Sequence, residues 1–248
     1  MVRHGDIQLI ENGDNYLLIA CDSAGAIGNK PEDIVQVDPE TVGFYTAIVP
    51  VIEILAARGK MISIVNTLSV EMHPTGERII NGIYRLMGHI GMSTDLLTGS
   101  TEENMSTVMT GVGVTVIGSI STERHHQKSL NQGDQLILMG YPKVGSNFLK
   151  DEVIGHKHEC VTIDDVLKMK NLQEIKDMIP VGSKGIEYEC RILSDRYGLK
   201  FQSVNHPVDM FQSAGPATCI VAGVEPSSID QMKQLLSPLP ITLLGGLL

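Results

Sequence analysis

The sequence predicts an α/β or α+β protein built from two domains, on three observations. Short apolar runs typical of strands alternate with amphipathic segments typical of helices in both halves of the chain. The chain has 248 residues, which is enough for two domains of about 100 to 150 residues each. A polar segment at residues 122–132 interrupts the pattern between the two halves. We therefore expect one domain over residues 1–125 and a second over residues 126–248.

Hydrophobic periodicity predicts the elements of the first half. The run NYLLIAC, residues 15–21, has the length and flanks of a buried strand that ends at Asp22. Apolar residues at steps of three and four predict a helix that begins at Pro74-Thr75 and stops at Gly91. The other elements expected here are a helix from Thr41 to about Gly59, kinked at Pro50, and strands at 61–68, 95–98 and 107–121.

The second half shows the same alternation. Thr162 and Asp165 have the spacing of a capping box, which predicts a helix over 162–169. A glycine-bearing loop is expected at 140–147. The remaining elements expected are strands at 134–139, 217–224 and 241–244, a helix at 184–196, and a helix capped by Ser227 or Ser228 that runs to Leu236.

Composition and charge exclude several classes of function. The formal net charge is −10, which repels polyanions, so we expect no nucleic-acid partner. The longest apolar stretch, at 47–57, is well short of the roughly 20 residues of a membrane-spanning helix. With no secretory signal at the N-terminus, we expect a cytoplasmic protein without a membrane partner. The four cysteines form no CxxC pair, which suits reduced thiols.

Common nucleotide-binding and hydrolase motifs are missing. The Gly59-Lys60 pair is followed by Met61, so there is no P-loop. The glycines of GVGVTVIG, residues 111–118, lie inside a strand pattern and not at a strand-to-helix turn, as dinucleotide binding would require. There is also no GxSxG nucleophile elbow.

Acidic residues are the remaining candidates for chemistry. Asp22 follows a buried strand, Glu53 lies inside an apolar helix, and STEE, residues 100–103, follows another strand. Carboxylates at strand ends beside small flexible turns suit Mg²⁺, which prefers hard oxygen ligands and bridges substrate phosphates. A simpler alternative is that Asp22 and Glu103 form turns or caps and that Glu53 faces outward.

Histidines give a weaker signal. HKHEC, residues 156–160, has a spacing that fits one face of a strand and contains soft zinc ligands, but no second half of a zinc site is visible. An ordinary surface segment explains it as well. His125 and His126 lie in the polar segment between the domains, where solvent exposure is expected.

Four blocks of the sequence resemble the ATP-dependent enzymes related to aminoimidazole ribonucleotide synthetase, which include thiamine-monophosphate kinase and selenophosphate synthetase. The resemblance follows the family order over nearly the whole chain, with trimming mainly in the second domain. It implies a two-domain fold, with a first-domain sheet that pairs with a second copy to give a homodimer. It also implies a smaller second domain over the substrate. The blocks are LLIACDSAGAIGNK (17–30), TVGFYTAIVPVIEILAARGK (41–60), LLTGSTEEN (96–104) and VGSKGIEYECRILSDRYGLKF (181–201).

The resemblance implies ATP and Mg²⁺ as cofactors and assigns the metal ligands. Asp22 matches the first magnesium aspartate of the family. Glu53 replaces the aspartate of the family's Asn-Asp pair, with Ile52 in place of its asparagine. Ser100 replaces the acid of the family's Gly-Gly-Asp/Glu-Thr turn, where Glu102 or Glu103 would compensate. Asp22 and Glu53 are therefore the expected catalytic and metal-binding residues, with Glu102 and Glu103 as further metal ligands.

The nucleotide and the acceptor are assigned in the same way. Lys30 or backbone amides of its loop would meet phosphate. Val181 and Lys184 replace two family aspartates at the substrate end, where Lys184 would attract an anionic group. The other residues expected at the nucleotide are Thr41, Gly43, Gly99, Ser100 and Thr101.

Within the superfamily the chain looks most like the kinases that phosphorylate α-ribazole in cobalamin salvage. This similarity implies transfer of the γ-phosphoryl group of Mg·ATP to a hydroxyl of a nucleoside-like molecule. Three alternatives stay open: thiamine-monophosphate phosphorylation, an ATP-dependent cyclase or dehydratase, and a non-catalytic ATP-binding scaffold.

Overall fold

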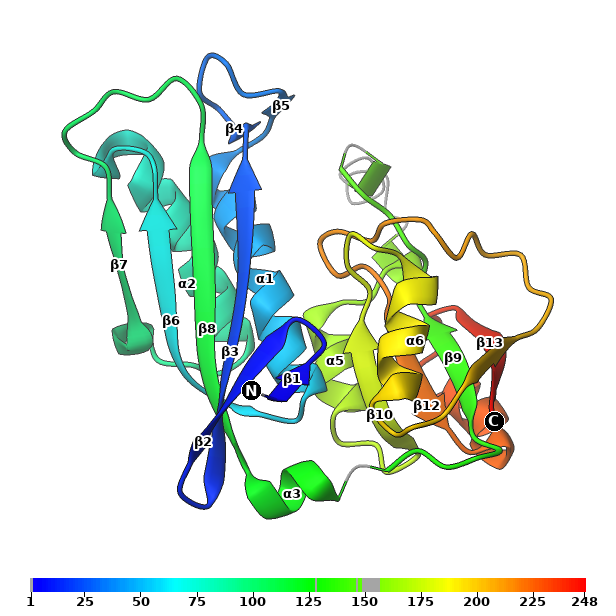
Figure 1. Cartoon of the computed structure of the whole chain (residues 1–248). Coiled ribbons are helices and arrows are strands. Elements are labelled where there is room, and N and C mark those ends of the chain that lie inside the picture. Colours follow the sequence, from blue (N-terminus) through cyan, green and yellow to red (C-terminus); the bar gives the residue numbers. More distant parts are fainter. Residues whose placement is uncertain (1, 128, 146, 149–156) are drawn as a thin grey trace. The chain divides into compact units, whose positions relative to one another are not determined.

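The computed structural model of the chain describes residues 2–127, 129–145, 147–148 and 157–248. Its contacts divide it into two compact units. Unit 1 comprises residues 7–54 and 59–119, and unit 2 comprises residues 2–6, 55–58 and 120–248. Each unit is built on its own β-sheet (Figure 1).

The first sheet has six strands in the order β1-β2-β3-β8-β6-β7. β2 and β3 form an antiparallel hairpin, β6 runs antiparallel to β8, and β6 runs parallel to β7. A short parallel pair, β4 (Ile27–Gly28) and β5 (Val35–Gln36), follows β3. The strands of the sheet are β1 (Val2–His4), β2 (Ile7–Asn12), β3 (Asn15–Gly25), β6 (Lys60–Leu68), β7 (Leu97–Thr101) and β8 (Gly111–Ser121).

Helices α1 (Pro39–Ala56) and α2 (Glu77–His89) cover one face of this sheet (Figure 1). They approach each other closely through two glycines. A Cβ on Gly43 would lie 1.9 Å from the carbonyl oxygen of Ile79, and a Cβ on Gly82 would lie 2.0 Å from that of Glu40. Only glycine permits such an approach between helix backbones, so Gly43 and Gly82 set the spacing of the pair.

Side chains of β3 alternate between the helix-covered face and the open face of the sheet. Leu18 and Ala20 are buried, whereas Leu17 and Ile19 are half-buried and Cys21 is exposed. Because the period of a strand is two residues, Asp22 shares the helix-covered face with Leu18 and Ala20. β8 alternates in the same way along its whole length.

The sheet of unit 2 has five strands in the order β10-β12-β9-β13-β11, and all neighbouring pairs are antiparallel. Its helices are α3 (Thr122–His126), α5 (Ile163–Met169), α6 (Ile186–Asp195) and α7 (Ile229–Leu235). Its strands are β9 (Gln135–Met139), β10 (Ile175–Pro180), β11 (Phe201–Ser203), β12 (Ile220–Val224) and β13 (Ile241–Leu247).

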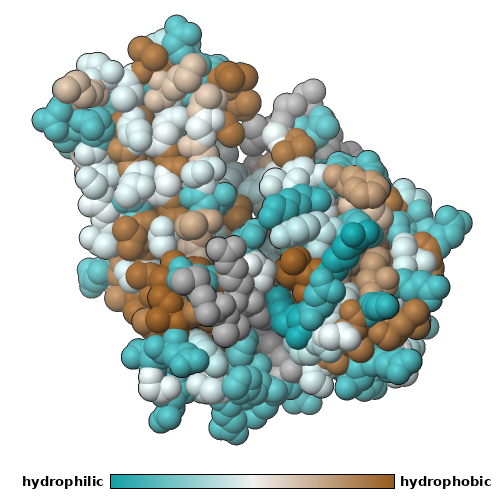
Figure 2. Space-filling model, viewed as in Figure 1, coloured by the Kyte–Doolittle hydropathy of each residue, from teal (hydrophilic) through white to brown (hydrophobic). Residues whose placement is uncertain are grey.

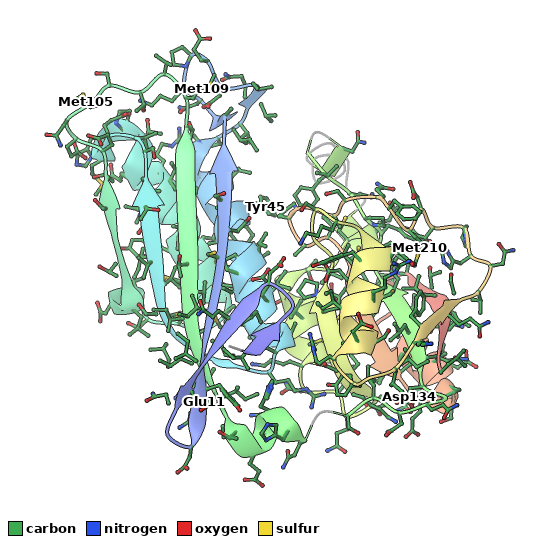
Figure 3. All side chains as sticks on the ribbon, viewed as in Figure 1. Glu11, Tyr45, Met105, Met109, Asp134 and Met210 are labelled. Atoms are coloured by element: carbon green, nitrogen blue, oxygen red, sulfur yellow. The ribbon has the colours of Figure 1, made fainter. Side chains whose placement is uncertain are left out.

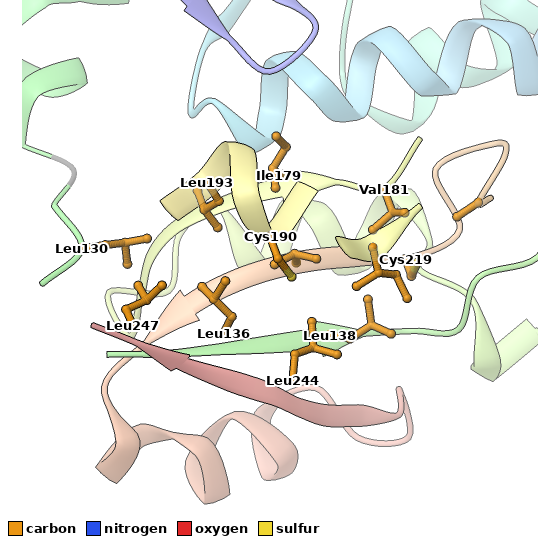
Figure 4. Packing of buried hydrophobic residues seen from close by; sticks show 13 residues of the cluster. Leu130, Leu136, Leu138, Ile179, Val181, Cys190, Leu193, Cys219, Leu244 and Leu247 are labelled. Carbon is orange, nitrogen blue, oxygen red and sulfur yellow. The ribbon is translucent and has the colours of Figure 1, made fainter. Parts of the chain in front are cut away.

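The core of unit 2 lies between the sheet and α6 (Figure 4). Leu136 and Leu138 of β9 and Val221 of β12 contribute fully buried side chains from the sheet, and Cys190 and Leu193 contribute them from α6. This burial fixes α6, and therefore the loop before it, on the sheet.

Most predicted elements are confirmed, with corrected bounds. The capping box of Thr162 and Asp165 is present in full. β3 does not end at Asp22 but continues to Gly25, and the amide of Ala26 still bonds the carbonyl oxygen of Thr110 at 2.9 Å. Residues 107–110 form a loop, because they bond to residues 26–33 and residue 69 instead of a neighbouring strand.

Other predictions needed larger corrections. The polar segment after residue 121 contains α3, and the strand expected at 95–98 is a short 3-10 helix (Thr94–Leu96) followed by β7. The helix expected from Pro74-Thr75 begins as a π-helical turn, Met72–Gly76. Ser228 makes no side-chain cap on α7. Strands β1, β2, β4, β5, β10 and β11 were not expected from the sequence. The boundary at residue 125 stays a prediction.

Among the described helices, α1 is the one long and apolar enough to cross a membrane. In this structure 67% of that stretch is buried inside the protein. The core helix of a soluble protein gives the same signal, so α1 is weak support for a membrane segment.

Candidate functional site

Three loops meet beyond the carboxyl ends of β3, β6 and β7, at one end of unit 1 (Figure 1). We call residues 26–38, 69–76 and 102–110 the carboxyl-end loops. Backbone hydrogen bonds tie them together: the amide of Glu32 donates to Val108 at 3.0 Å, and that of Glu102 donates to Val70 at 3.0 Å. Met105 and Met109 project from the last of these loops (Figure 3), and Met105 is 73% exposed.

Asp33 organises the first of these loops from a buried position. Its carboxylate accepts hydrogen bonds from the Thr110 amide and hydroxyl, both at 2.7 Å, and from the Lys30 amide at 2.9 Å. A Cβ on Gly28 would lie 2.3 Å from the Thr110 hydroxyl, so the loop closes around this carboxylate. Asp33 therefore has a structural role that its type and position in the sequence did not reveal.

Lys30 reaches the second loop. Its ammonium forms an ion pair with Glu71, whose other carboxylate oxygen accepts a hydrogen bond from the Thr75 hydroxyl at 2.5 Å. Burial opposes ionisation of Glu71, but the hydrogen bonds from Lys30 and Thr75 lower its pKa below the ordinary value. Glu71 was missed from the sequence, because it is 41 residues from Lys30 and no local motif contains it.

Glu102 and Glu103 hold the third loop. Glu102 accepts hydrogen bonds from the amides of Asn104 and Met105, which lower its pKa. Glu103 accepts hydrogen bonds from the Thr101 hydroxyl at 2.7 Å and from the Met72 amide at 2.8 Å. Both carboxylates therefore accept hydrogen bonds from groups of unit 1 itself. This is the arrangement of the simpler alternative, in which Glu103 forms a turn.

Asp22 lies three residues before the end of β3, on the helix-covered face and half-buried. Burial raises its pKa above the ordinary value, and the Ser23 amide lowers it to a smaller extent. A carboxylate whose ionisation is opposed by desolvation gains free energy when a cation approaches. The position therefore fits a metal ligand.

The structure places the other nucleotide candidates of unit 1 as follows. Thr41 is half-buried in the first turn of α1, and Gly43 is buried against α2. Gly99 lies beside Asn66, whose carbonyl oxygen would be 2.2 Å from an added Cβ. Ser100 pairs with Thr67, an exposed residue of β6, so it lies on the open face of the sheet, opposite to Asp22.

Glu53 lies next to Ile54 in the last turns of α1 and is half-buried. Ile54 and Leu18 both lie against Gly59. Leu18 precedes Asp22 by four residues, which is about 13 Å along a strand. A shared metal ion for Glu53 and Asp22 remains a prediction.

Lys184 belongs to unit 2, in the turn before α6. Its ammonium lies 4.4 Å from the ring centroid of Tyr188 and 3.2 Å from the Tyr188 hydroxyl, which raises the pKa of Lys184. Gly185 adopts φ 83° and lies against the backbone of Phe211, where a side chain would not fit. The side chain of Lys184 is exposed.

Glu189 of α6 is a titratable group that sequence reasoning missed. It is 4% exposed. Burial and the neighbouring Asp6 raise its pKa to about 7, although Lys184 and the Gly182 amide lower it. The sequence signal that could have singled out Glu189 is a charged residue on the otherwise apolar face of a helix.

No group of three or more His, Cys, Asp or Glu side chains is arranged to hold a metal ion among the described residues. His156 of the predicted HKHEC segment lies outside them. Mg²⁺ at a nucleotide site needs only one or two carboxylates, because substrate phosphates and waters complete its coordination. The four cysteines, all of them among the described residues, are not joined by disulfides.

The two units define the two-domain fold of the enzymes related to aminoimidazole ribonucleotide synthetase, as the sequence predicted. Solved structures of thiamine-monophosphate kinase and of PurL share it. No protein-family model and no curated protein matches the chain.

Three particular structures illustrate the likeness. AaThiL complexed with AMPPCP and TMP is 16% identical, with a TM-score of 0.66, over 98% of this chain and 84% of that one. Thiamine-monophosphate kinase from Stenotrophomonas maltophilia is 13% identical, with a TM-score of 0.65, over 98% and 88%. PurL of T. maritima complexed with ADP is 14% identical, with a TM-score of 0.65, over 100% of this chain but 42% of PurL.

Proposed function

We propose that this protein is an ATP-dependent kinase that transfers the γ-phosphoryl group of Mg·ATP to a hydroxyl of a small nucleoside-like molecule. The observation that carries the proposal is the charge of the carboxyl-end loops, on a fold whose solved members include complexes with AMPPCP and ADP. Lys30 is the single Lys or Arg of these loops, and it stands among six carboxylates. These are Glu32, Asp33, Asp38, Glu71, Glu102 and Glu103.

This charge pattern supports Mg²⁺ as the partner of the nucleotide. Lys30 is paired with Glu71, and Arg78 of α2 is paired with Asp38. These two cations cannot also balance a triphosphate, so a divalent cation is needed for charge balance. Asp22 fits as its ligand because its carboxylate is hard, half-buried and costly to ionise without a cation. When bound, Mg²⁺ supplies neutralisation of the phosphate charge.

The residues of this chain then act mainly by positioning, which is the usual basis of phosphoryl transfer. Lys30 contacts a phosphate, and Thr41 lines the nucleotide. Gly43 contributes through the spacing of α1 and α2. Gly99, Thr101 and the backbone of Ser100 form the phosphate end of β7, because the Ser100 side chain lies on the open face. Glu102 and Glu103 are the further carboxylates beside it.

We propose α-ribazole as the acceptor, supported by the sequence resemblance. Thiamine monophosphate is the second candidate, because solved kinases of that name share the fold. Val181 and Lys184 stand where the resemblance expects aspartates, which favours an acceptor other than thiamine monophosphate.

We propose further that unit 1 forms a homodimer through the open face of its sheet. Figure 2 shows apolar residues on this face, interspersed with weakly polar ones. The half-buried side chains that support this proposal are Leu17, Ile19, Val65, Thr115 and Ile117. Burial of this face against a second copy would remove its apolar side chains from water and so stabilise the dimer.

The test is product formation from Mg·ATP with a panel of acceptors: α-ribazole, thiamine monophosphate and aminoimidazole precursors. We expect phosphorylated α-ribazole, lost with Asp22→Asn and retained with Asp14→Asn, an exposed aspartate in the β2–β3 turn. Phosphorylation of thiamine monophosphate alone would refute the α-ribazole assignment. ATP cleavage without a phosphorylated acceptor would favour a cyclase or dehydratase, and ATP binding without turnover would favour a scaffold.

A further inference from the structure

Lys30 is held at both its backbone and its side chain. Its amide donates to Asp33 at 2.9 Å, and its carbonyl oxygen accepts a hydrogen bond from the Gln36 side chain at 3.1 Å. Its ammonium is paired with Glu71. The Lys30 side chain is 15% exposed. Lysine side chains ordinarily keep much rotamer freedom, so this one is unusually fixed.

Glu71 is fixed in turn by the π-helical turn that it precedes. Thr75, which is 3% exposed, donates its hydroxyl to Glu71, and the Gly76 amide donates to the Glu71 carbonyl oxygen at 2.9 Å. A Cβ on Gly76 would lie 2.8 Å from that oxygen, so the turn is tight. The carboxylate therefore has one oxygen for Thr75 and one for Lys30.

The arrangement leaves donors available on Lys30. An ammonium has three N–H groups, and among the described residues Glu71 is the one side chain to which Lys30 donates. We propose that Glu71 is a positioning residue which, with Thr75, holds the Lys30 ammonium so that its remaining N–H groups bind a phosphate of the nucleotide. This inference rests on the proposed function, because it needs ATP at the carboxyl-end loops.

The test compares Mg·ATP affinity by calorimetry in four proteins: the wild type, Glu71→Gln, Lys30→Met and the double variant. We expect Glu71→Gln to weaken binding about tenfold, the size expected for loss of one well-placed charged hydrogen bond. Because Glu71 acts through Lys30, the double variant should bind no more weakly than Lys30→Met. The matched control is Glu77→Gln, an exposed carboxylate that pairs with His73 and should leave affinity unchanged.

A second pair of variants tests the same contact in case Glu71→Gln does not fold. Thr75→Val removes the hydroxyl that orients Glu71 and should weaken binding, whereas Thr75→Ser keeps the hydroxyl and should restore it. Lysine ammonium NMR gives a readout independent of ATP. The Lys30 signal should exchange slowly with water in the wild type and be lost in Glu71→Gln.

The outcomes are distinguishable. Unchanged or tighter binding in Glu71→Gln, or further weakening in the double variant, would overturn the positioning role. A wild type that binds no Mg·ATP would refute the proposed function, and the inference with it, whether or not the Lys30 ammonium signal is protected.

Discussion

The carboxylate of Asp33 accepts hydrogen bonds from both the backbone amide and the side-chain hydroxyl of Thr110, at 2.7 Å each. The two residues are 77 positions apart, and both are buried. This contact joins the loop after β3 to the loop before β8.

Replacement of Asp33 by alanine should destabilise unit 1 by about 3 kcal/mol, because the buried amide and hydroxyl of Thr110 lose their hydrogen-bond acceptor. Urea unfolding measures the loss, and hydrogen exchange at the Thr110 amide should accelerate. Asp14→Ala, in an exposed turn, should change stability by less than about 0.5 kcal/mol. Equal effects of the two variants would contradict the role assigned to Asp33.

Gly43 and Gly88 test helix packing with the same substitution. Gly43→Ala places a Cβ 1.9 Å from the Ile79 carbonyl oxygen, so α1 and α2 must separate, at a cost of about 3 kcal/mol. Gly88→Ala, in α2 with nothing within 4 Å of its Cβ, should stabilise the protein by about 0.5 to 1 kcal/mol. Thermal unfolding of both variants measures the contrast, and a stable Gly43→Ala would refute the close-packing account.

Glu189 makes stability depend on pH around neutrality. The folded state keeps the proton of Glu189 up to about pH 7, whereas the unfolded chain loses it near 4.5. Between these values the folded state binds more protons, so stability should fall as pH rises, by about 3 kcal/mol at most.

The Glu189→Gln variant should lose this dependence and be more stable than the wild type at pH 8. Denaturant unfolding between pH 5 and pH 8 measures it. Asp195→Asn, an exposed residue of the same helix, should keep the wild-type slope. If the unfolding free energy of Glu189→Gln depended on pH as in the wild type, another group would be responsible for the pH dependence.

The homodimer proposal predicts the effect of a charge on the open face of the first sheet. Ile19→Glu should give a monomer by analytical ultracentrifugation, because an unpaired carboxylate would be buried between two copies. Asn81→Glu, on the exposed side of α2, should leave the assembly unchanged. A monomeric wild type would contradict the proposal directly.

Regular elements with a strong local signal could be predicted from the sequence. The apolar spacing of α2 and the capping box of Thr162 and Asp165 both depend on residues within a few positions of one another. β10 was missed because it carries Asp177 and Pro180, a charged residue and a strand breaker, whose environments are set by the tertiary fold. Asp177 is buried against Arg196 and Tyr197.

Some residues of the candidate site could likewise be predicted from the sequence, and others could not. Asp22 follows an apolar strand and resembles a family motif, so the sequence was enough to single it out. The roles of Asp33 and Glu71 depend on partners 77 and 41 residues away, which no local pattern contains. Contacts of this kind become visible only when the loops are brought together by the sheet.

Side chains along β3 alternate between the two faces of the sheet. The face on which Asp22 lies therefore depends on whether the number of residues between the β2–β3 turn and Asp22 is odd or even. Leu17, Leu18, Ile19 and Ala20 supply apolar groups to both faces, so hydrophobicity alone opposes a one-residue slip only weakly. The pairing of Asn12 with Asn15 in the hairpin fixes which face receives the carboxylate. An insertion of one residue between that turn and Asp22 would move the carboxylate away from the helices, and an insertion of two would return it. Among relatives of this chain, length changes between the β2–β3 turn and Asp22 should therefore come in even numbers wherever Asp22 is in use.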